Sequence, residues 1–232
     1  MDHASFTKAE TDLLVSATEQ LPALGVALLA AEALSVAIDG DSVPDGDNAQ
    51  YYLRSAIFVQ SIMALRTARA CCLVAGAGYA PEAHGLKRRL SEIHAWSQAI
   101  CADDSGQRAR EWLDGRGGTP RKVVNRFGLL ELFDVYSLSA HADARGVHTW
   151  LTERSDDGTN GIQVMPRRDA PLANAMLTEV AMECHDLAKV QAAARGFAHG
   201  VPATLQGLDA LQALIEEMVE RYYAPAEADP AT

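Results

Sequence analysis

The residue types best suited to chemistry lie in KRRLSEIH, residues 87–94. Arg88 and Arg89 precede His94 by six and five positions. A histidine can act in acid/base chemistry, and an arginine can stabilise phosphate charge. With seven histidines in the chain, such a spacing arises about once by chance. On a helix Arg88 and Glu92 share one side, whereas Arg89 and His94 lie about 140° apart. We take Arg88, Glu92 and His94 as catalytic candidates and Arg89 as a binding candidate.

A second cluster of polar side chains lies in YSLSAHADARGVH, residues 136–148. Tyr136 and Ser139 share one side of an expected helix and are binding candidates. His141 falls at its C-terminus, where the helix macrodipole favours a charged imidazole, and is a further catalytic candidate. If this helix packs on the helix that carries Arg88, the cluster is either a buried hydrogen-bonded network that fixes helix register, which we favour, or a ligand site.

Metal and nucleophile motifs are weak in this chain. His141, Asp143 and His148 form H-x-D-x4-H, and all three are competent ligands, but the spacing matches no motif with a defined geometry. The E-x-x-H pairs of di-iron carboxylate bundles and the G-x-S-x-G elbow of hydrolases do not occur. The loop DGRGGTP lacks the G-K-[ST] ending of a phosphate loop. We therefore expect no metal and no cofactor.

Composition limits the partners and the compartment. The chain has 232 residues, a net charge of −11 and 48% hydrophobic residues, so one globular domain is expected and DNA is not an expected partner. The four cysteines show no C-x-x-C spacing and are typical of reduced core residues. The stretch MDHASFTKAETDLL lacks a basic region followed by an apolar run, so no signal peptide is expected. The apolar stretch 21–38 contains Glu32, so we expect a cytoplasmic protein without a membrane span.

These residues must be positioned by helices. Periodicity and turn signals predict an all-α bundle of about six to seven helices, with a small β-hairpin insertion near 147–166. Residues 1–222 are expected to form a single helical domain, and residues 223–232 a disordered tail. The expected helices cover about 7–38 with a kink at Pro22, 49–75, 81–102, 105–113, 123–139, 171–197 and 204–222.

Three arginines on the second of these helices, Arg54, Arg66 and Arg69, are informative. The helix is apolar nearly all round, so it is expected in the middle of the bundle. A guanidinium there needs a carboxylate, a carbonyl or a ligand. We favour ion pairs with neighbouring helices, and we keep Arg54 as a candidate for ligand binding.

Over residues 49–200 the chain resembles a bacterial all-helical domain-of-unknown-function family that is distantly similar to HEPN domains. The resemblance rests on QYYLRSAIFVQ, on an R-x-x-x-E pair (Arg88 and Glu92) and on Y-x-x-S-x-H (Tyr136, Ser139 and His141). The family typically reads R-S-L-L-E on one helix and S-x-x-x-H-P on a later one, whereas only one residue separates Ser139 from His141 here. The resemblance implies a helical fold, and HEPN domains include metal-independent ribonucleases.

Two functions follow as hypotheses. The favoured one is a non-catalytic binding or regulatory module, in a toxin or phage-defence context and as a candidate homodimer. The alternative is a HEPN-like metal-independent ribonuclease or nucleotide-binding enzyme. In that case Arg88 or Arg89 would bind phosphate, and His94 or His141 would act as acid or base on RNA or a nucleotide.

Overall fold

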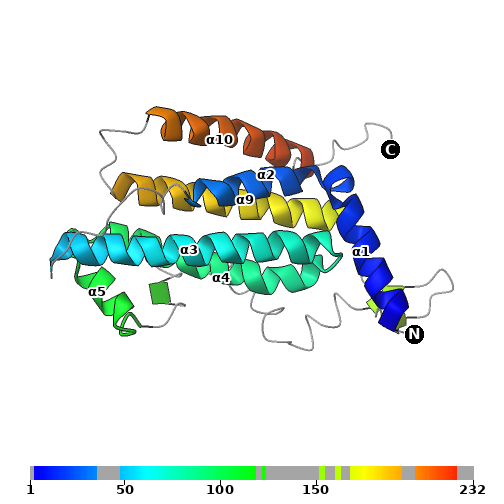
Figure 1. The fold of residues 1–232 in the computed structure, drawn as a ribbon, viewed down its shortest axis with the longest axis horizontal. Coiled ribbons are helices and arrows are strands. Elements are labelled where there is room, and N and C mark those ends of the chain that lie inside the picture. Colours follow the sequence, from blue (N-terminus) through cyan, green and yellow to red (C-terminus); the bar gives the residue numbers. More distant parts are fainter. Residues whose placement is uncertain are drawn as a thin grey trace, which may run out of the picture.

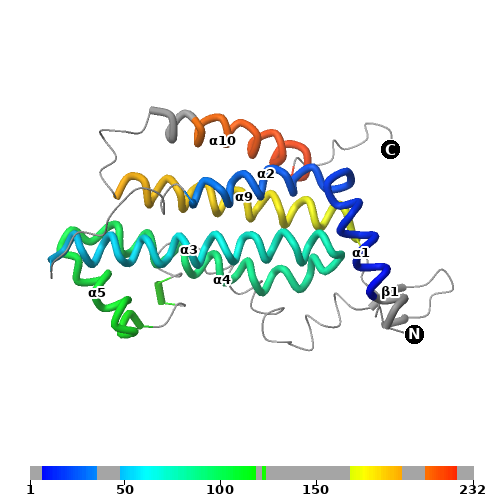
Figure 2. Tube along the Cα trace, in the orientation of Figure 1, coloured from blue at the N-terminus to red at the C-terminus, as the bar shows by residue number. Residues whose placement is uncertain are grey.

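The computed structural model describes residues 3–35, 48–118, 122–123, 152–154, 160–162, 168–194 and 202–223. Within these ranges the chain forms seven helices, and the predicted multi-helix bundle is confirmed (Figure 1). The helices are α1 (His3–Gln20), α2 (Pro22–Ala33), α3 (Ala49–Gly76), α4 (Ala80–Cys101), α5 (Gln107–Leu113), α9 (Ala170–Ala194) and α10 (Pro202–Tyr223). The long helices α3, α4, α9 and α10 run along the long axis of the bundle, and α1 crosses one end (Figure 2).

The corner between α1 and α2 replaces the single kinked helix expected over 7–38. The axes of Thr7–Gln20 and Pro22–Ala33 differ by 86°. Pro22 has no N–H to continue the helical ladder, and it stands in the first turn of α2. The side chain of Asn174 on α9 then accepts a hydrogen bond from the N–H of Ala23 at 3.1 Å. The turn therefore places α2 against α9.

The core lies around α9, which packs against α2, α3, α4 and α10. Large buried side chains of α9 include Met176, Leu177 and Leu187. They belong to the same core cluster as small buried residues of α2, among them Ala27 and Ala30. Small side chains let helix axes approach closely, and the larger ones from α9 fill the space between them.

Helix α3 contacts α1, α2, α4, α5 and α9, but it keeps a stripe open to solvent. Val59, Arg66, Arg69 and Leu73 are exposed along this stripe. The expectation that Arg66 and Arg69 lie on a buried helix is therefore wrong. The helices that pack on α3 leave this side of it uncovered, although its sequence is apolar on nearly every side. Arg69 forms an ion pair with Glu32 of α2, as the ion-pair interpretation predicted.

By length and composition alone, α3 could cross a membrane, and 39% of its apolar window is buried inside the bundle. The core helix of a soluble protein meets the same criteria. The cytoplasmic location stays a prediction.

Two short strands lie in the segment where the hairpin was expected. Thr152–Arg154 (β1) and Asn160–Ile162 (β2) pair antiparallel, with Thr152 opposite Ile162. The other residues of 147–166 lie outside the described ranges. The same holds for the expected helix over 123–139 beyond its first residue, and for 224–232 of the expected tail.

Candidate functional site

A cluster of charged and polar side chains is buried between α4 and α9. Lys87, Ser91 and His94 lie on one stripe of α4, and Glu179 and Glu183 lie one turn apart on α9. We call these five residues the charge cluster. Nδ1 of His94 donates to Oε1 of Glu183 at 2.7 Å, and Oγ of Ser91 donates to its Oε2 at 3.3 Å. Nζ of Lys87 lies 3.3 Å from Glu179 and 3.7 Å from Glu183.

The charge cluster places one lysine against two carboxylates, of which that of Glu183 is buried and that of Glu179 is partly exposed. The Lys87 side chain is only 2% exposed and that of Glu183 9%. Burial by itself favours the neutral carboxyl of Glu183, but the hydrogen bond from His94 and the charge of Lys87 outweigh it, and the pKa of Glu183 is lowered. Together with Glu179, the Glu183 carboxylate thus supplies the counter-charge for a lysine inside the bundle.

Next to the charge cluster, four amide and hydroxyl side chains connect α3, α4 and α9. Ser61 donates to the Gln191 side chain at 2.8 Å, Gln191 donates to Ser97 at 3.4 Å, and Ser97 donates to Gln60 at 2.5 Å. All four residues are fully buried. Buried amides and hydroxyls joined in this way fix the register of the three helices.

The predicted catalytic and binding candidates on α4 fall into two separate groups. Arg88 and Arg89 face Glu92, with nitrogen-to-oxygen distances of 3.3 and 3.7 Å. His94 belongs instead to the charge cluster, and its Nε2 accepts a hydrogen bond from the Gln98 amide at 3.1 Å. Within the described part of the chain, no hydrogen bond or ion pair joins His94 to an arginine.

The remaining predicted site residues do not join the charge cluster within the described part of the chain. Arg54 is half-buried on α3, and its buried Nε has no hydrogen-bond partner among the described residues. Tyr136, Ser139 and His141 lie outside the described ranges, as do Asp143 and His148 of the metal alternative. Over the residues that the structure describes, no group of three His, Cys, Asp or Glu side chains could hold a metal ion.

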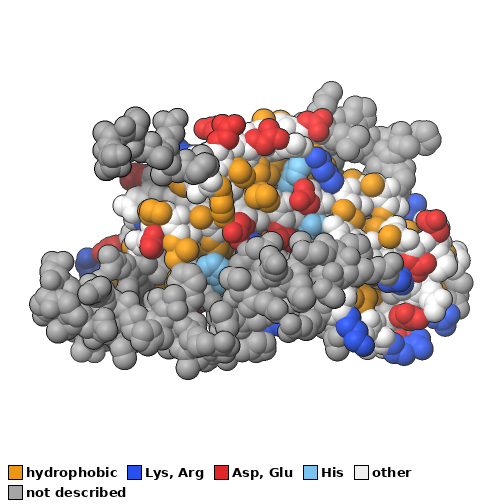
Figure 3. Space-filling model, turned by 180° about the vertical axis from the view of Figure 1, so that it is seen from behind, with side chains coloured by type: hydrophobic (Ala, Val, Ile, Leu, Met, Phe, Trp, Pro, Cys, Tyr) orange, Lys and Arg blue, Asp and Glu red, His pale blue; other side chains and the backbone are white. Residues whose placement is uncertain are grey.

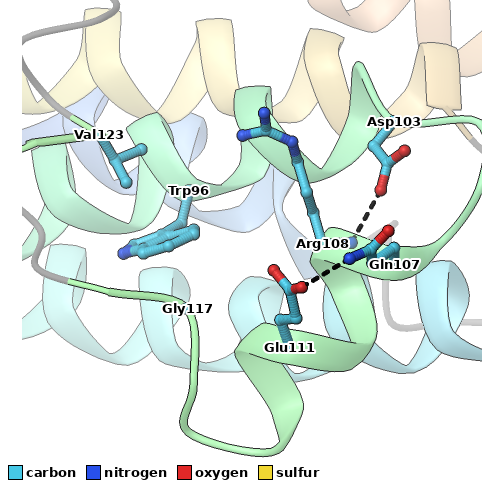
Figure 4. A pocket seen from close by; sticks show the side chains of 7 residues that line it. All are labelled: Trp96, Asp103, Gln107, Arg108, Glu111, Gly117 and Val123. Atoms are coloured by element: carbon cyan, nitrogen blue, oxygen red, sulfur yellow. Dashed lines mark hydrogen bonds between the residues drawn. The ribbon is translucent and has the colours of Figure 1, made fainter.

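The structure adds a pocket that the sequence did not indicate. It has a volume of about 340 Å³ and lies where the end of α4 meets α5 (Figure 4). Its lining consists of Trp96, Asp103, Gln107, Arg108, Glu111, Gly117 and Val123. In the view of Figure 4 the guanidinium of Arg108 lies higher than the Trp96 ring, and the carboxylate of Glu111 lies lower. We call this the α4–α5 pocket.

Two glycines shape the corner that holds the α4–α5 pocket. Gly106 precedes α5 at φ +70°, and a Cβ there would lie 2.6 Å from Cα of Ala49, so the turn packs directly on the start of α3. A Cβ at Gly117 would lie 2.8 Å from the ring of Trp96. The bare backbone of Gly117 therefore lies against the indole.

Hydrogen bonds hold the polar side chains of the pocket in place. Asp103 accepts from the N–H of Arg108 at 2.7 Å and from the Ser105 hydroxyl at 2.6 Å. These bonds, that of Arg108 first, lower the pKa of Asp103. Nε2 of Gln107 donates to Oε1 of Glu111 at 2.8 Å. Asp103 thus secures the turn into α5, while Gln107 orients Glu111.

Sequence reasoning missed the pocket because its residues come from three segments that only the tertiary fold brings together. Gln107, Arg108 and Glu111 carry a helical spacing, which is also that of an ordinary solvated helix. One residue could have indicated the pocket: Gly117 lies in the Gly-rich loop DGRGGTP, and a glycine in a loop can mark a close approach of the backbone to another group.

Comparison with known proteins gives no assignment: no family model, no curated protein and no solved structure matches the chain. The resemblance to a HEPN-like family therefore stays a prediction.

Proposed function

We propose that the chain is a non-catalytic binding or regulatory module, with the α4–α5 pocket as its ligand site. The observation that carries the proposal is the state of His94, the best-placed acid/base candidate. Its side chain is 8% exposed, and both ring nitrogens are already engaged, by Glu183 and Gln98. A general acid or base must reach the substrate within hydrogen-bond distance. The ring nitrogens of His94 form their hydrogen bonds inside the bundle, so neither is available to a substrate.

The arginines on α4 support the same proposal. Glu92 faces Arg88 and Arg89 together, so their charge is partly compensated. A phosphate would have to compete with this carboxylate, which is only 13% exposed. The arginines and the histidine thus take part in separate interactions and do not form a shared phosphate site.

The surface charge also favours a module over a nuclease. Asp209, Glu216, Glu217 and Glu220 are exposed along α10. In Figure 3 acidic side chains line the α10 edge of the face seen from behind, and histidine and acidic side chains lie among hydrophobic ones below it. This acidic edge repels a phosphate backbone, whereas Lys and Arg side chains gather at the lower right of the same view.

An RNA-cleavage assay tests the proposal. Purified protein is incubated with labelled total RNA in the presence of a chelator, beside His94→Gln and Arg88→Ala variants whose folding is checked by thermal unfolding. We expect no cleavage above the buffer control for any of them. Cleavage by the wild type that His94→Gln or Arg88→Ala abolishes would establish the HEPN-like ribonuclease alternative.

The same preparation tests the predicted homodimer by light scattering. A mass of one chain at all concentrations would reject it. The toxin or phage-defence context stays a prediction.

A further inference from the structure

We propose that the α4–α5 pocket binds a free amino acid, as its zwitterion, with an aromatic or other apolar side chain. This inference rests on the proposed function and names the ligand class of the same site. It assigns three roles: Arg108 to the ligand carboxylate, Glu111 to the ligand ammonium, and Trp96 to the ligand side chain.

The pocket offers one available charge of each sign. Of its two carboxylates, Asp103 is used by the turn, because its oxygens accept from Ser105 and from the N–H of Arg108. Glu111 accepts from Gln107 through Oε1, which leaves Oε2 for a ligand. Within the described residues the guanidinium of Arg108 forms no ion pair or side-chain hydrogen bond, although its charge also acts on Asp103 and contributes to the lowered pKa of that carboxyl.

This charge pattern selects among ligand classes. A phosphate would be repelled by two carboxylates at a site with one guanidinium. A simple cation would pair with Glu111 but would be repelled by the guanidinium of Arg108. A zwitterion satisfies both, since a guanidinium recognises a carboxylate through paired hydrogen bonds and a carboxylate accepts from an ammonium.

The rest of the lining suits an apolar side chain. The Trp96 indole forms one wall, and Val123 adds a second apolar surface (Figure 4). Aromatic rings pack on an indole in offset or edge-to-face geometry. The volume of about 340 Å³ is at the small end of the range for ligand pockets, which suits a small molecule such as an amino acid.

Isothermal titration of the full chain with three related compounds tests the charge roles. L-phenylalanine carries both charges, phenylalanine amide lacks the carboxylate, and N-acetylphenylalanine lacks the ammonium. We expect L-phenylalanine to bind with a Kd below about 1 mM and each derivative to bind about tenfold to hundredfold more weakly, the effect of one charge-assisted hydrogen bond.

Two variants connect each loss to its residue. In Arg108→Gln we expect L-phenylalanine and its amide to bind equally, and in Glu111→Gln we expect L-phenylalanine and the acetylated compound to bind equally. Arg110→Gln is the matched control, because Arg110 lies on the same helix over the ring of Tyr52 at 5.2 Å. Its affinities should equal those of the wild type.

The opposing outcomes are distinct. Adenosine binding more tightly than L-phenylalanine, with sensitivity to Arg108→Gln, would overturn the ligand class and leave the binding module intact. Absence of saturable binding by L-phenylalanine, L-tryptophan and L-leucine would overturn the inference. Failure of the proposed function is measured separately, by RNA cleavage that depends on His94.

Discussion

Replacing Glu183 by glutamine should destabilise the fold through charge alone, because the two side chains have nearly the same shape. In the wild type, the Glu183 carboxylate lies 2.7 Å from Nδ1 of His94 and 3.7 Å from Nζ of Lys87. Removing one partner of a buried ion pair costs about 3–5 kcal/mol. We expect the lower end, about 3 kcal/mol of unfolding free energy in urea, because Glu179 remains 3.3 Å from Lys87.

The lowered pKa of Glu183 also predicts how the stability difference between wild type and Glu183→Gln changes with pH. Burial disfavours the Glu183 carboxylate, but the hydrogen bond from His94 and the charge of Lys87 together hold its pKa below the ordinary value of 4.5. A group whose pKa is lowered on folding stabilises the fold above its unfolded pKa, and this contribution is lost as the pH falls through the folded pKa. The difference between wild type and Glu183→Gln should therefore be full at pH 7 and shrink below about pH 4.5.

Two further variants make the test specific. Asp186→Asn changes a carboxylate on the same helix that is 58% exposed, and it should alter stability by less than about 0.5 kcal/mol. Lys87→Met combined with Glu183→Gln should cost less than the sum of the single changes, since the double variant removes the buried lysine together with one of its two carboxylate partners. If Glu183→Gln matches Asp186→Asn at pH 7, the carboxylate does not stabilise the cluster and the reasoning is refuted.

Three further outcomes are expected. Gly106→Ala should cost at least about 2 kcal/mol in urea unfolding, and more than Gly115→Ala, since both glycines have positive φ but only Gly106 packs against the backbone of α3. Arg168→Lys should cost about 1–3 kcal/mol and expose α1 to limited proteolysis, because the guanidinium donates to carbonyls of both α1 and α3. Burial raises the pKa of Cys71 and Cys72 to about 12, so iodoacetamide at pH 8 should alkylate them far more slowly in the native protein than in urea, as read by mass spectrometry.

The sequence predicted the start of a helix correctly where a capping residue or a proline marks that start. The side chain of Asn48 accepts from the N–H of Tyr51 at 2.9 Å, which caps α3 near its expected start. Pro81 stands in the first turn of α4 as expected. The corner at Pro22 was predicted only as a kink, because a proline breaks the ladder while the angle is set by packing of α2 on α9, a contact between segments about 150 residues apart.

The site was less predictable than the fold. His94 was recognisable as a chemical group, but its partner Glu183 lies 89 positions away, and nothing in one sequence pairs them. Gln60, Ser97 and Gln191 read as ordinary helix residues until the fold buries them together. Polar partners in a bundle come from different helices. Periodicity therefore predicts on which face of its own helix a residue lies, but it does not predict which residue of another helix it contacts.

The burial pattern of α4 decides where a function should be sought. Residues 93–97 are all buried, so α4 is surrounded there on every side. A polar side chain in such a segment must be hydrogen-bonded inside the protein, as His94 and Ser97 are, and its substitution then changes stability before it changes binding. Trp96 lies in the same segment but faces the α4–α5 pocket, whose polar groups come from α5 and the turn before it. A ligand can therefore reach Arg108 and Glu111 without disturbing the buried network, which makes these two residues the sharper test of function and the charge cluster the sharper test of folding.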